Sequence, residues 1–419
     1  MELDETALTL LCTQQRCIQE LRIGPLDCNF AALMDSHLLP SDWLQNVRDL
    51  ELPYALADEN NLVAYRKMLE LSPNLQCLTI KCHRILRNVR LPTNFWDTAS
   101  SDGALLSKVF QPLHVNVATK LQSLQGINLV HQRLGYAERS FLRVIDVSKL
   151  NRLVIEYCEN SDHLLALVAE AFRKSGTHLR NFTYRVSSFD PTVLESFLGS
   201  FNGLRRLYIA ADSNTQSFDF SSVTGHSSSV QQLAVLNHEE LQGFSPDVNG
   251  RAESIEKLCG KCKALKQLAL VFPSIKIDQG DWQAMGSALD ALRHLPEVKT
   301  VRILNWPEVH REFFSSYEGE LIDTLERTAY LSELDVFATA LMRKLESIRE
   351  GRDLPIVCFG DDKIRMASDV DGFMTLLDPT CYVGVKQIGV FGRSETVAVR
   401  MSLAQARYVE PEHNILFET

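Results

Sequence analysis

Few residues in this sequence stand at the spacings that catalysis or metal binding requires. Cys259-Gly-Lys-Cys262 is a C-x-x-C pair, but a structural zinc site needs four ligands and no second pair lies nearby. Asp369-Val-Asp371-Gly has the first ligands of a calcium loop and lacks the later ones. We therefore interpret the first as two thiols at the end of a helix and the second as a turn.

The sequence also lacks the short motifs that accompany catalysis or nucleotide binding. It contains no G-x-x-x-x-G-K-[ST], G-x-G-x-x-G, G-x-S-x-G or H-E-x-x-H. Its 11 histidines form no metal spacing. We expect a chain that is not an enzyme and that has no catalytic residue, no metal and no cofactor. An enzyme on a degenerate α/β fold is the alternative of another class.

The composition limits which cellular compartments and which classes of partner we expect for this chain. The 419 residues carry a net charge of −10, so the chain is a poor match for nucleic-acid phosphates or an anionic membrane. The N-terminus lacks a basic start followed by an apolar run, and no apolar stretch is long enough to span a membrane. We therefore expect ten reduced cysteines in a cytoplasmic or nuclear protein that binds neither nucleic acid nor membrane.

A repeated pattern is the strongest signal in the chain. Three apolar residues recur at relative positions 0, 3 and 5, the L-x-x-L-x-L spacing of leucine-rich repeats. Successive triplets begin 25 to 35 residues apart, except for one interval of 49. The triplets are Ile18/Leu21/Ile23, Val47/Leu50/Leu52, Leu75/Leu78/Ile80, Leu124/Ile127/Leu129, Leu150/Leu153/Ile155, Leu179/Phe182/Tyr184, Leu204/Leu207/Ile209, Val230/Leu233/Val235, Leu265/Leu268/Leu270, Val298/Val301/Ile303 and Leu331/Leu334/Val336.

One triplet means little in a chain that is 45% hydrophobic, but eleven in order predict an α/β leucine-rich-repeat solenoid. Its strands would form a curved parallel sheet, and helices such as 162–174 and 191–198 would cover the convex side. A doubly wound α/β fold is the alternative, although its strands should be continuous apolar runs. The repeats are irregular: the Asn or Cys expected three residues after the last core position appears only as Cys158.

The domain organisation follows from where the repeats change. We expect the solenoid over residues 1–340, with an insertion at about 83–120 that contains Trp96. Residues 341–419 should form a β-containing cap, with a strand at 356–359 and a hairpin of 386–391 and 396–403 joined at Gly392-Arg-Ser-Glu. Leu321 to Ile348 also fits one long helix, which would remove the eleventh repeat.

The concave face of such a sheet would carry the ligand. Its first half is polar: Glu20, Arg22, Asp49, Glu51, Thr79, Lys81, Asn128, Arg152, Glu156, Asn181, Thr183, Arg185, Arg206 and Tyr208. We expect a protein partner there, and Arg and Tyr dominate interface hot spots. The candidate partner-binding residues are Arg152, Glu156, Arg185, Arg206, Tyr208, Leu236, Val271, Leu304 and Trp96. A solvated surface with incidental ion pairs is the alternative.

The seventh position of the later strands turns apolar. The residues are Ala210, Leu236, Val271, Leu304 and Phe337. An exposed apolar row of this length indicates an interface. Two explanations remain open: the C-terminal segment from about Cys381 to Phe417 folds back over the row, or a partner protein or apolar ligand binds there.

The irregular repeats, and segments such as LTLLCTQQRCIQELRIGPLD and LELSPNLQCLTIKC, resemble the repeat regions of fungal F-box and leucine-rich-repeat proteins over about residues 1–340. The resemblance implies the substrate-recognition part of an SCF-type ubiquitin ligase, in which an N-terminal F-box binds a Skp1-type adaptor. Residues 1–17 are too short for an F-box, so we expect that module upstream or lost. A stand-alone repeat protein unrelated to ubiquitin is the alternative.

Overall fold

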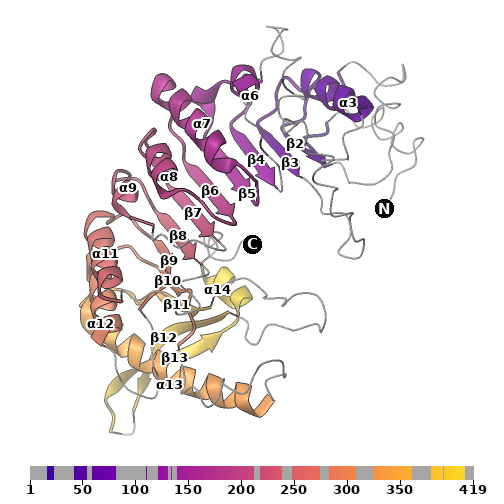
Figure 1. Ribbon diagram of the computed structural model, residues 1–419. Coiled ribbons are helices and arrows are strands. Elements are labelled where there is room, and N and C mark those ends of the chain that lie inside the picture. The colour runs from indigo at the N-terminus through magenta and orange to yellow at the C-terminus, as the bar shows by residue number, and fades with distance from the viewer. Residues whose placement is uncertain are drawn as a thin grey trace. The chain divides into compact units, whose positions relative to one another are not determined.

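The computed structural model describes residues 17–22, 42–53, 59–81, 110, 121–130, 134, 139–211, 218–237, 248–273, 283–307, 324–360, 379–389 and 391–410. The chain divides into two compact units, Met1–Leu204 (unit 1) and Arg205–Thr419 (unit 2). Each unit contains strands and helices that follow one another along the chain (Figure 1). No described helix is long and apolar enough to cross a membrane.

The described strands of unit 1 lie side by side in chain order, and neighbours pair in parallel. They are β1 (Glu20–Arg22), β2 (Asp49–Pro53), β3 (Cys77–Lys81), β4 (Gly126–Val130), β5 (Arg152–Glu156) and β6 (Asn181–Val186). The helices are α3 (Glu59–Glu70), α6 (Arg139–Val144), the short 3-10 helix η2 (Val147–Lys149), α7 (Ser161–Ser175) and α8 (Pro191–Leu198). These helices lie on one face of the strands (Figure 1).

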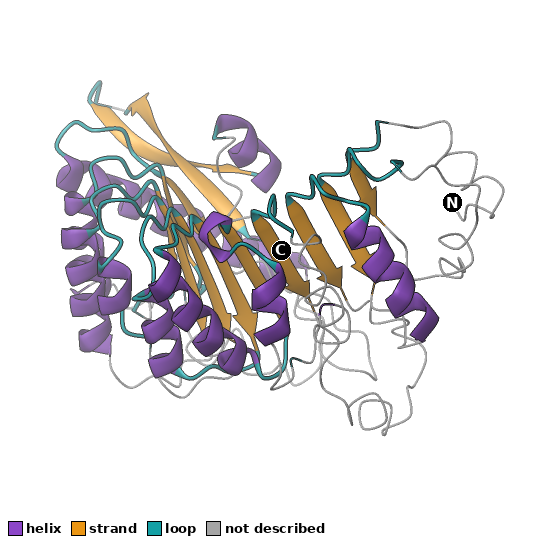
Figure 2. Cartoon of the chain, turned by 90° about the horizontal axis from the view of Figure 1, so that it is seen from above, coloured by secondary structure: helices purple, strands orange, loops and turns teal. Residues whose placement is uncertain are grey.

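Unit 2 continues the same alternation and then changes direction. Strands β7 to β11 are parallel, whereas β11, β12 and β13 pair antiparallel. The strands are β7 (Arg206–Ala211), β8 (Gln232–Asn237), β9 (Gln267–Leu270), β10 (Thr300–Ile303), β11 (Ile356–Phe359), β12 (Thr380–Ile388) and β13 (Ser394–Met401). The helices are α9 (Ser221–Thr224), α11 (Val248–Lys261), α12 (Gln283–Asp290), η3 (Ala291–His294), α13 (Thr324–Arg349) and α14 (Leu403–Val409). Helix α14 lies on the opposite face from the connecting helices (Figure 2).

One hydrogen-bond pattern recurs where the parallel strands begin. The carbonyl of the residue before a strand accepts two N–H groups from the start of the next strand. In unit 1 these acceptors are Gln19, Arg48, Gln76, Gln125 and Asn151, at 2.7 to 3.0 Å. In unit 2, Arg205, Gln231 and Lys266 repeat the arrangement at 2.7 to 3.2 Å. The repeat read from the sequence is therefore also a repeat of backbone geometry.

The triplet residues form the core of each unit because side chains alternate between the two faces of a strand. In unit 1 the register aligns Leu50, Leu78, Ile127, Leu153 and Phe182, each 2% exposed or less. They lie on the face that the helices cover. The described connecting helices of each unit occupy one face, whereas a doubly wound fold would have them on both.

Aromatic rings fill the core of unit 1 between β6 and the helices α7 and α8. The Phe197 ring lies 4.7 Å from the ring of Phe182, 5.2 Å from that of Phe201 and 5.8 Å from that of Phe172, between centroids. All four rings are buried. Asp190 caps the start of helix α8: its carboxylate accepts the Thr192 N–H, and Pro191 fits the first turn. This cap directs Phe197 and Leu198 into the core.

Ten of the eleven expected strands are confirmed, and so are the helices expected at 162–174 and 191–198. The eleventh triplet is wrong as a strand: Leu331, Leu334 and Val336 lie on α13, the long helix that the sequence offered as the alternative. Val336 is 66% exposed, and Phe337, expected on the concave face, packs its ring 5.8 Å from that of Phe359. A leucine-rich helix matches the same spacing, because positions 0 and 3 also share one helix face.

The expected C-terminal strands are confirmed with different limits. Strand β11 occupies 356–359, but it pairs in parallel with β10 and so extends the parallel series. The hairpin strand expected to begin at Lys386 begins at Thr380, and the turn lies at 389–393 instead of 392–395. The 340/341 boundary falls inside α13. Most of the 83–120 insertion lies outside the described residues; Phe110 is described and fully buried.

We predict that Phe197→Ala lowers the free energy of unfolding by about 3–5 kcal/mol, because it leaves a cavity among three rings. Urea denaturation followed by circular dichroism measures the change. The matched control is Arg180→Ala on the exposed residue before β6, which should change stability by less than about 0.5 kcal/mol. Equal effects from both variants would contradict the packing described for α8.

Candidate functional site

The face of unit 1 without described helices carries two polar rows. The register aligns one row as Glu20, Asp49, Cys77, Gly126, Arg152 and Asn181. It aligns the other as Arg22, Glu51, Thr79, Asn128, Val154 and Thr183. Apart from Gly126 and Val154, these residues are exposed or half-buried. The face therefore offers charges and hydrogen-bonding groups at the regular spacing of neighbouring strands.

A small contact group lies in the middle of this face, on β3 and β4. The Asn128 amide donates to Thr79 Oγ1 at 2.8 Å and contacts Cys77 Sγ at 3.7 Å. A Cβ added at Gly126 would lie 3.2 Å from Cys77 Sγ and 3.7 Å from Arg152 Cβ, so glycine leaves the space between those two side chains open. Burial raises the pKa of the Cys77 thiol, although Arg152 opposes the shift. The thiol is thus a polar contact and a poor nucleophile.

Three of the candidate partner-binding residues lie on β5 and β6. Arg152 is exposed at the start of β5, and Glu156 is half-buried at its end, directly opposite Arg185. Arg185 differs from the expected exposed contact, because it is only 8% exposed and its guanidinium lies 5.3 Å from the centre of the Tyr157 ring. Tyr157 has a left-handed φ of 51°, and its N–H donates to the Arg185 carbonyl at 2.5 Å. Arg185 therefore packs within unit 1, while Arg152 remains open.

The remaining described candidates belong to unit 2. Arg206 is exposed at the start of β7. Tyr208, two residues later, is half-buried and packs against an apolar cluster on the face opposite the connecting helices. Arg206 and Tyr208 thus belong to a different unit from Arg152, Glu156 and Arg185. Trp96 lies outside the described residues.

The apolar row expected on the later strands is covered by the chain's own C-terminal segment. Leu236, Val271 and Leu304 are 5 to 6% exposed. They form one cluster with the following residues: Ala210, Ala234, Ala269, Ile356, Cys358, Cys381 and Ala406, against which Tyr208, Met401 and Leu403 pack. Ala406 belongs to α14 and Met401 to β13. Of the two explanations for this row, the fold-back is therefore confirmed, and these three residues offer no open surface.

Two local features hold α14 in place. Its first turn is closed by a capping box, in which Ser402 and Gln405 each bond the other's backbone N–H. At its other end, an ion pair of 3.3 Å joins Glu410, directly after α14, to Lys299, directly before β10. The capping box sets the direction of the helix, and Ala406, fully buried, is small enough to let α14 approach the strands closely.

Helix α13 closes the end of the unit 2 strands. Among the described strands, β13 pairs with β12 alone, so the backbone groups on its other side need partners. Thr339 Oγ1 accepts the Ala398 N–H at 3.2 Å, and Arg343 donates to the Thr396 carbonyl at 3.0 Å. Asp335 accepts hydrogen bonds from the Tyr382 hydroxyl and the Arg400 guanidinium. Helix α13 therefore supplies hydrogen-bond partners for backbone groups at the outer edge of β13, which could otherwise pair with another strand.

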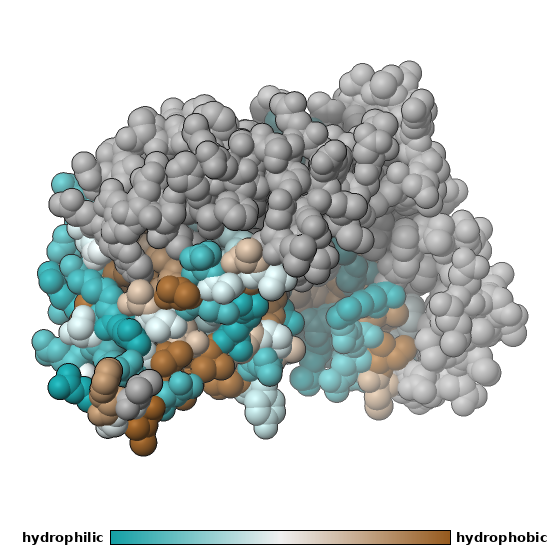
Figure 3. Space-filling view, turned by 90° about the horizontal axis from the view of Figure 1, so that it is seen from below, coloured by the Kyte–Doolittle hydropathy of each residue, from teal (hydrophilic) through white to brown (hydrophobic). Residues whose placement is uncertain are grey.

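The hairpin of β12 and β13 extends beyond this contact and ends in exposed apolar side chains. Ile388 is 82% exposed and Phe391 is 89% exposed. Brown apolar surface interrupts the polar surface on this part of unit 2 (Figure 3). These side chains are open to solvent, in contrast to the covered cluster beneath α14.

We predict that Ala406→Asp detaches α14, because a carboxylate in this fully buried position costs more than about 2 kcal/mol. Hydrogen exchange of the 403–409 amides should accelerate, and binding of an apolar dye should rise as the cluster becomes exposed. Tyr408→Asp is the matched control on the same helix, since Tyr408 is 88% exposed. Unchanged exchange in Ala406→Asp would show that α14 does not cover the cluster in solution.

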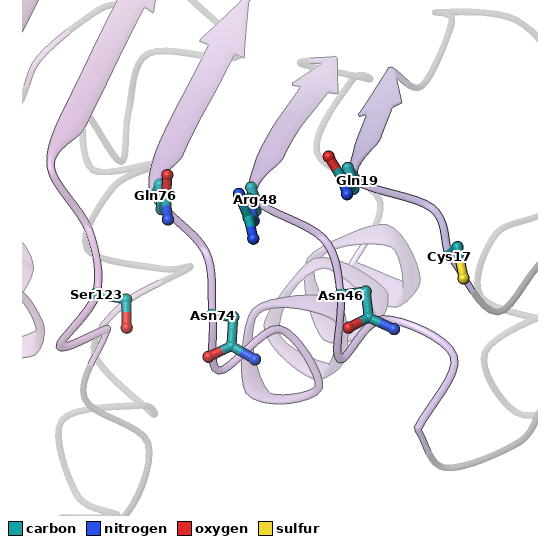
Figure 4. Close-up of a pocket in the computed structure, with 7 residues that line it drawn as sticks. All are labelled: Cys17, Gln19, Asn46, Arg48, Asn74, Gln76 and Ser123. Atoms are coloured by element: carbon teal, nitrogen blue, oxygen red, sulfur yellow. The ribbon is translucent and has the colours of Figure 1, made fainter.

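A pocket of about 270 Å³ lies where the first strands of unit 1 begin. Its lining residues are Cys17, Gln19, Asn46, Arg48, Asn74, Gln76 and Ser123. Gln19, Arg48 and Gln76 come from equivalent positions in successive repeats and lie side by side (Figure 4). The described lining offers amides, one guanidinium, one hydroxyl and one thiol, which suit hydrogen bonding to a polar ligand. Sequence analysis missed this pocket, although the polar residue after each leading apolar residue signalled the row.

The C-x-x-C pair has the structural role expected for it. Cys259 is on α11 and Cys262 directly follows it, and both are buried. Burial raises the pKa of Cys259 to about 12 and that of Cys262 to about 11. Such thiols stay protonated at neutral pH and are weak ligands and nucleophiles. The Leu265 N–H donates to the Cys262 carbonyl at 3.2 Å, which closes the turn into β9.

We predict that alkali destabilises the protein through these two thiols. Their folded pKa values lie above the ordinary value of 9.0, so the stabilisation is present below about pH 9 and is lost as pH rises, because only the unfolded chain releases the protons. From about pH 7.5 to about pH 9.5 each thiol should lower the free energy of unfolding by about 0.8 kcal/mol. Urea denaturation of the wild type and of Cys259→Ala/Cys262→Ala measures the difference; equal slopes would contradict this assignment.

Three polar side chains form a largely buried hydrogen-bonded group on α7 and β6: Ser161, Asp162 and Tyr184. The Tyr184 hydroxyl donates to Asp162 Oδ1 at 2.9 Å and lies 2.8 Å from Ser161 Oγ. Burial raises the pKa of both Asp162 and Tyr184. Asp162 Oδ2 also accepts the Asp190 N–H at 3.2 Å. These bonds link the start of α7 to β6 and to the start of α8, so the group is accounted for by its structural role.

No group of His, Cys, Asp and Glu among the described residues could hold a metal ion. No protein-family model matches the sequence, and no curated protein matches it either.

Proposed function

We propose that the chain is a non-catalytic leucine-rich-repeat scaffold that binds a protein partner on the face of unit 1 without described helices. The observation that supports this most directly is the difference between the two units. In unit 1 this face carries half-buried and exposed polar side chains, whereas in unit 2 most of the corresponding positions after β7 are buried and contribute to the apolar cluster with the C-terminal segment.

The leucine-rich class is supported by the spacing of the triplets and by one thiol. Cys158 donates to the carbonyls of Leu129 and Glu156, both at 3.4 Å. It stands at the position where these repeats carry Asn or Cys. An Asn or Cys there serves to hold the backbone between neighbouring repeats, which is the contact that Cys158 makes.

The binding role is supported by the charges on the face. Asp49 and Arg152 lie in one row, on β2 and β5, with Cys77 and Gly126 between them. Both are exposed, and neither is buried by a neighbouring side chain. A partner with charges complementary to both would bind in one orientation, because the strands fix the spacing between them.

We predict that charge reversal on this face weakens binding of the partner protein. The partner is first identified by crosslinking to the wild-type chain, and its affinity is then measured with the purified proteins. Arg152→Glu should weaken binding at least about tenfold, which is about 1.4 kcal/mol. Lys174→Glu, on an exposed position of α7, is the matched control and should leave the affinity unchanged. Equal affinity for the wild type and Arg152→Glu would overturn the assignment of this face.

The finer proposal is the substrate-recognition part of an SCF-type ubiquitin ligase, which rests on the resemblance of the repeats. Its test is co-purification of a Skp1-type adaptor with the product of the complete transcript. An adaptor that binds stoichiometrically supports the ligase role. If the adaptor does not bind, the chain is a stand-alone repeat protein, and the binding face of unit 1 is unaffected.

A further inference from the structure

Two cysteines of unit 2 stand directly opposite each other on neighbouring antiparallel strands. Cys358 on β11 is the register partner of Cys381 on β12. Neither side chain has any exposed surface, and both belong to the apolar cluster beneath α14. Both are free thiols in this structure. Opposite residues of a strand pair project to the same face, so the two sulfur atoms share one side of the sheet.

The backbone bonds of β11 show which kind of pair this is. The Ile356 N–H donates to the Lys299 carbonyl at 2.8 Å, and the Gly360 N–H donates to the Ile303 carbonyl at 2.9 Å. Alternate residues of β11 therefore direct their backbone groups to β10. Cys358, midway between Ile356 and Gly360, belongs to that set, so its N–H and carbonyl point away from β12.

The other side of the hairpin gives the same result independently. The Ala398 N–H and the Thr396 carbonyl bond to side chains of α13, so these residues of β13 point away from β12. The alternate residues of β13, including Met401, face β12. Cys381 is the partner of Met401 and therefore directs its backbone groups toward β13. Cys358 and Cys381 thus form a non-hydrogen-bonded pair.

That geometry places the two residues within reach of a covalent bond. Cα atoms of a non-hydrogen-bonded antiparallel pair lie about 4.5 Å apart, the closer of the two spacings. Disulfides join Cα atoms about 4.4–6.8 Å apart. We propose that Cys358 and Cys381 form a reversible disulfide that fastens the hairpin and α14 to the last parallel strand.

Thiol–disulfide exchange with a small-molecule disulfide such as oxidised glutathione supplies the oxidation. The thiolate of one cysteine attacks a glutathione sulfur, forms a mixed disulfide and releases one glutathione thiolate. The second cysteine thiolate then attacks the protein sulfur of that bond and releases the second glutathione. Two protein thiols lose two protons and two electrons, and one glutathione disulfide is reduced to two glutathione molecules.

The bond has a consequence for the covered cluster. Ala406 of α14 belongs to the same buried cluster as both cysteines, Leu236, Val271 and Leu304. The disulfide would fix the beginning of β12 against β11, directly beneath α14. Oxidation therefore tightens the cover, and reduction allows it to open. Because the thiols are buried, exchange in the folded chain requires α14 to lift transiently.

In the test, the full chain is equilibrated with oxidised and reduced glutathione. This is done once with the folded chain and once during refolding from urea, when the two thiols are accessible to glutathione. Peptide mapping without reductant should find Cys358 linked to Cys381, and reductant should release the link. Oxidation should lower the unfolding equilibrium constant at least about tenfold, because a cross-link restricts the unfolded chain. Hydrogen exchange of the 403–409 amides should slow on oxidation.

Matched variants distinguish the effects of the Cys358–Cys381 disulfide from the effects of oxidation at other cysteines. Cys358→Ser and Cys381→Ser should each abolish the link and the stabilisation. Cys158→Ser removes a buried cysteine of unit 1, retains its hydrogen-bond donor and should leave both intact. Absence of the Cys358–Cys381 peptide after refolding would overturn the proposal, as would a link of either cysteine to Cys259 or Cys262. A link that forms without stabilising the fold would also overturn its role as a fastening of the cover.

Discussion

The parallel strands of both units depend on a shared hydrogen bond at their entry. One carbonyl before each strand accepts two N–H groups from the next, which sets the register of the pair before the strands begin. Register matters here because a slip of one residue would turn every triplet side chain from the helix-covered face to the other face. The apolar core of unit 1, from Leu50 to Phe182, exists only because successive repeats keep this alignment. No single repeat can bury its own apolar face, so each is stabilised by its neighbours.

A fixed register also determines what the opposite face presents. In unit 1 the side chains between core positions are mainly polar, and they remain half-buried or exposed. In unit 2 the equivalent positions are mainly small or apolar, and the chain covers them with α14. The pocket lined by Gln19, Arg48 and Gln76 has the same origin, because equivalent residues of successive turns come side by side when the strands align. Binding surface and covered surface are thus two outcomes of one backbone arrangement.

The ends of a stacked array need a different solution, since an edge strand leaves backbone groups unpaired. Unit 2 reverses direction at β11 and ends in an antiparallel hairpin whose outer edge bonds to α13. That reversal creates the opposed cysteines: parallel strands bring equivalent repeat positions together, whereas the antiparallel pair brings together Cys358 and Cys381. The end of the array is therefore also the place where new side-chain chemistry appears.

Sequence patterns were sufficient to predict the elements whose side chains recur at a regular spacing. Ten triplets predicted strands, and the helices at 162–174 and 191–198 followed from their spacing and caps. The eleventh triplet failed because a leucine-rich helix satisfies the same spacing, and only packing against β12 and β13 distinguishes α13 from a strand. The polar and apolar halves of the open face were visible in the sequence, and so was the possibility that the tail covers the apolar half.

The choice between a tail that covers the apolar row and an open row required the folded structure. Leu236 and Ala406 are far apart in the chain, and the sequence around one of them does not predict a contact with the other. The same limit explains Arg185, which looked like an exposed contact until the left-handed Tyr157 placed a ring beneath its guanidinium. It explains the pocket and the cysteine pair as well. Periodicity specifies which face a residue occupies, whereas contacts between distant residues depend on the register and direction of strands that meet only in the folded chain.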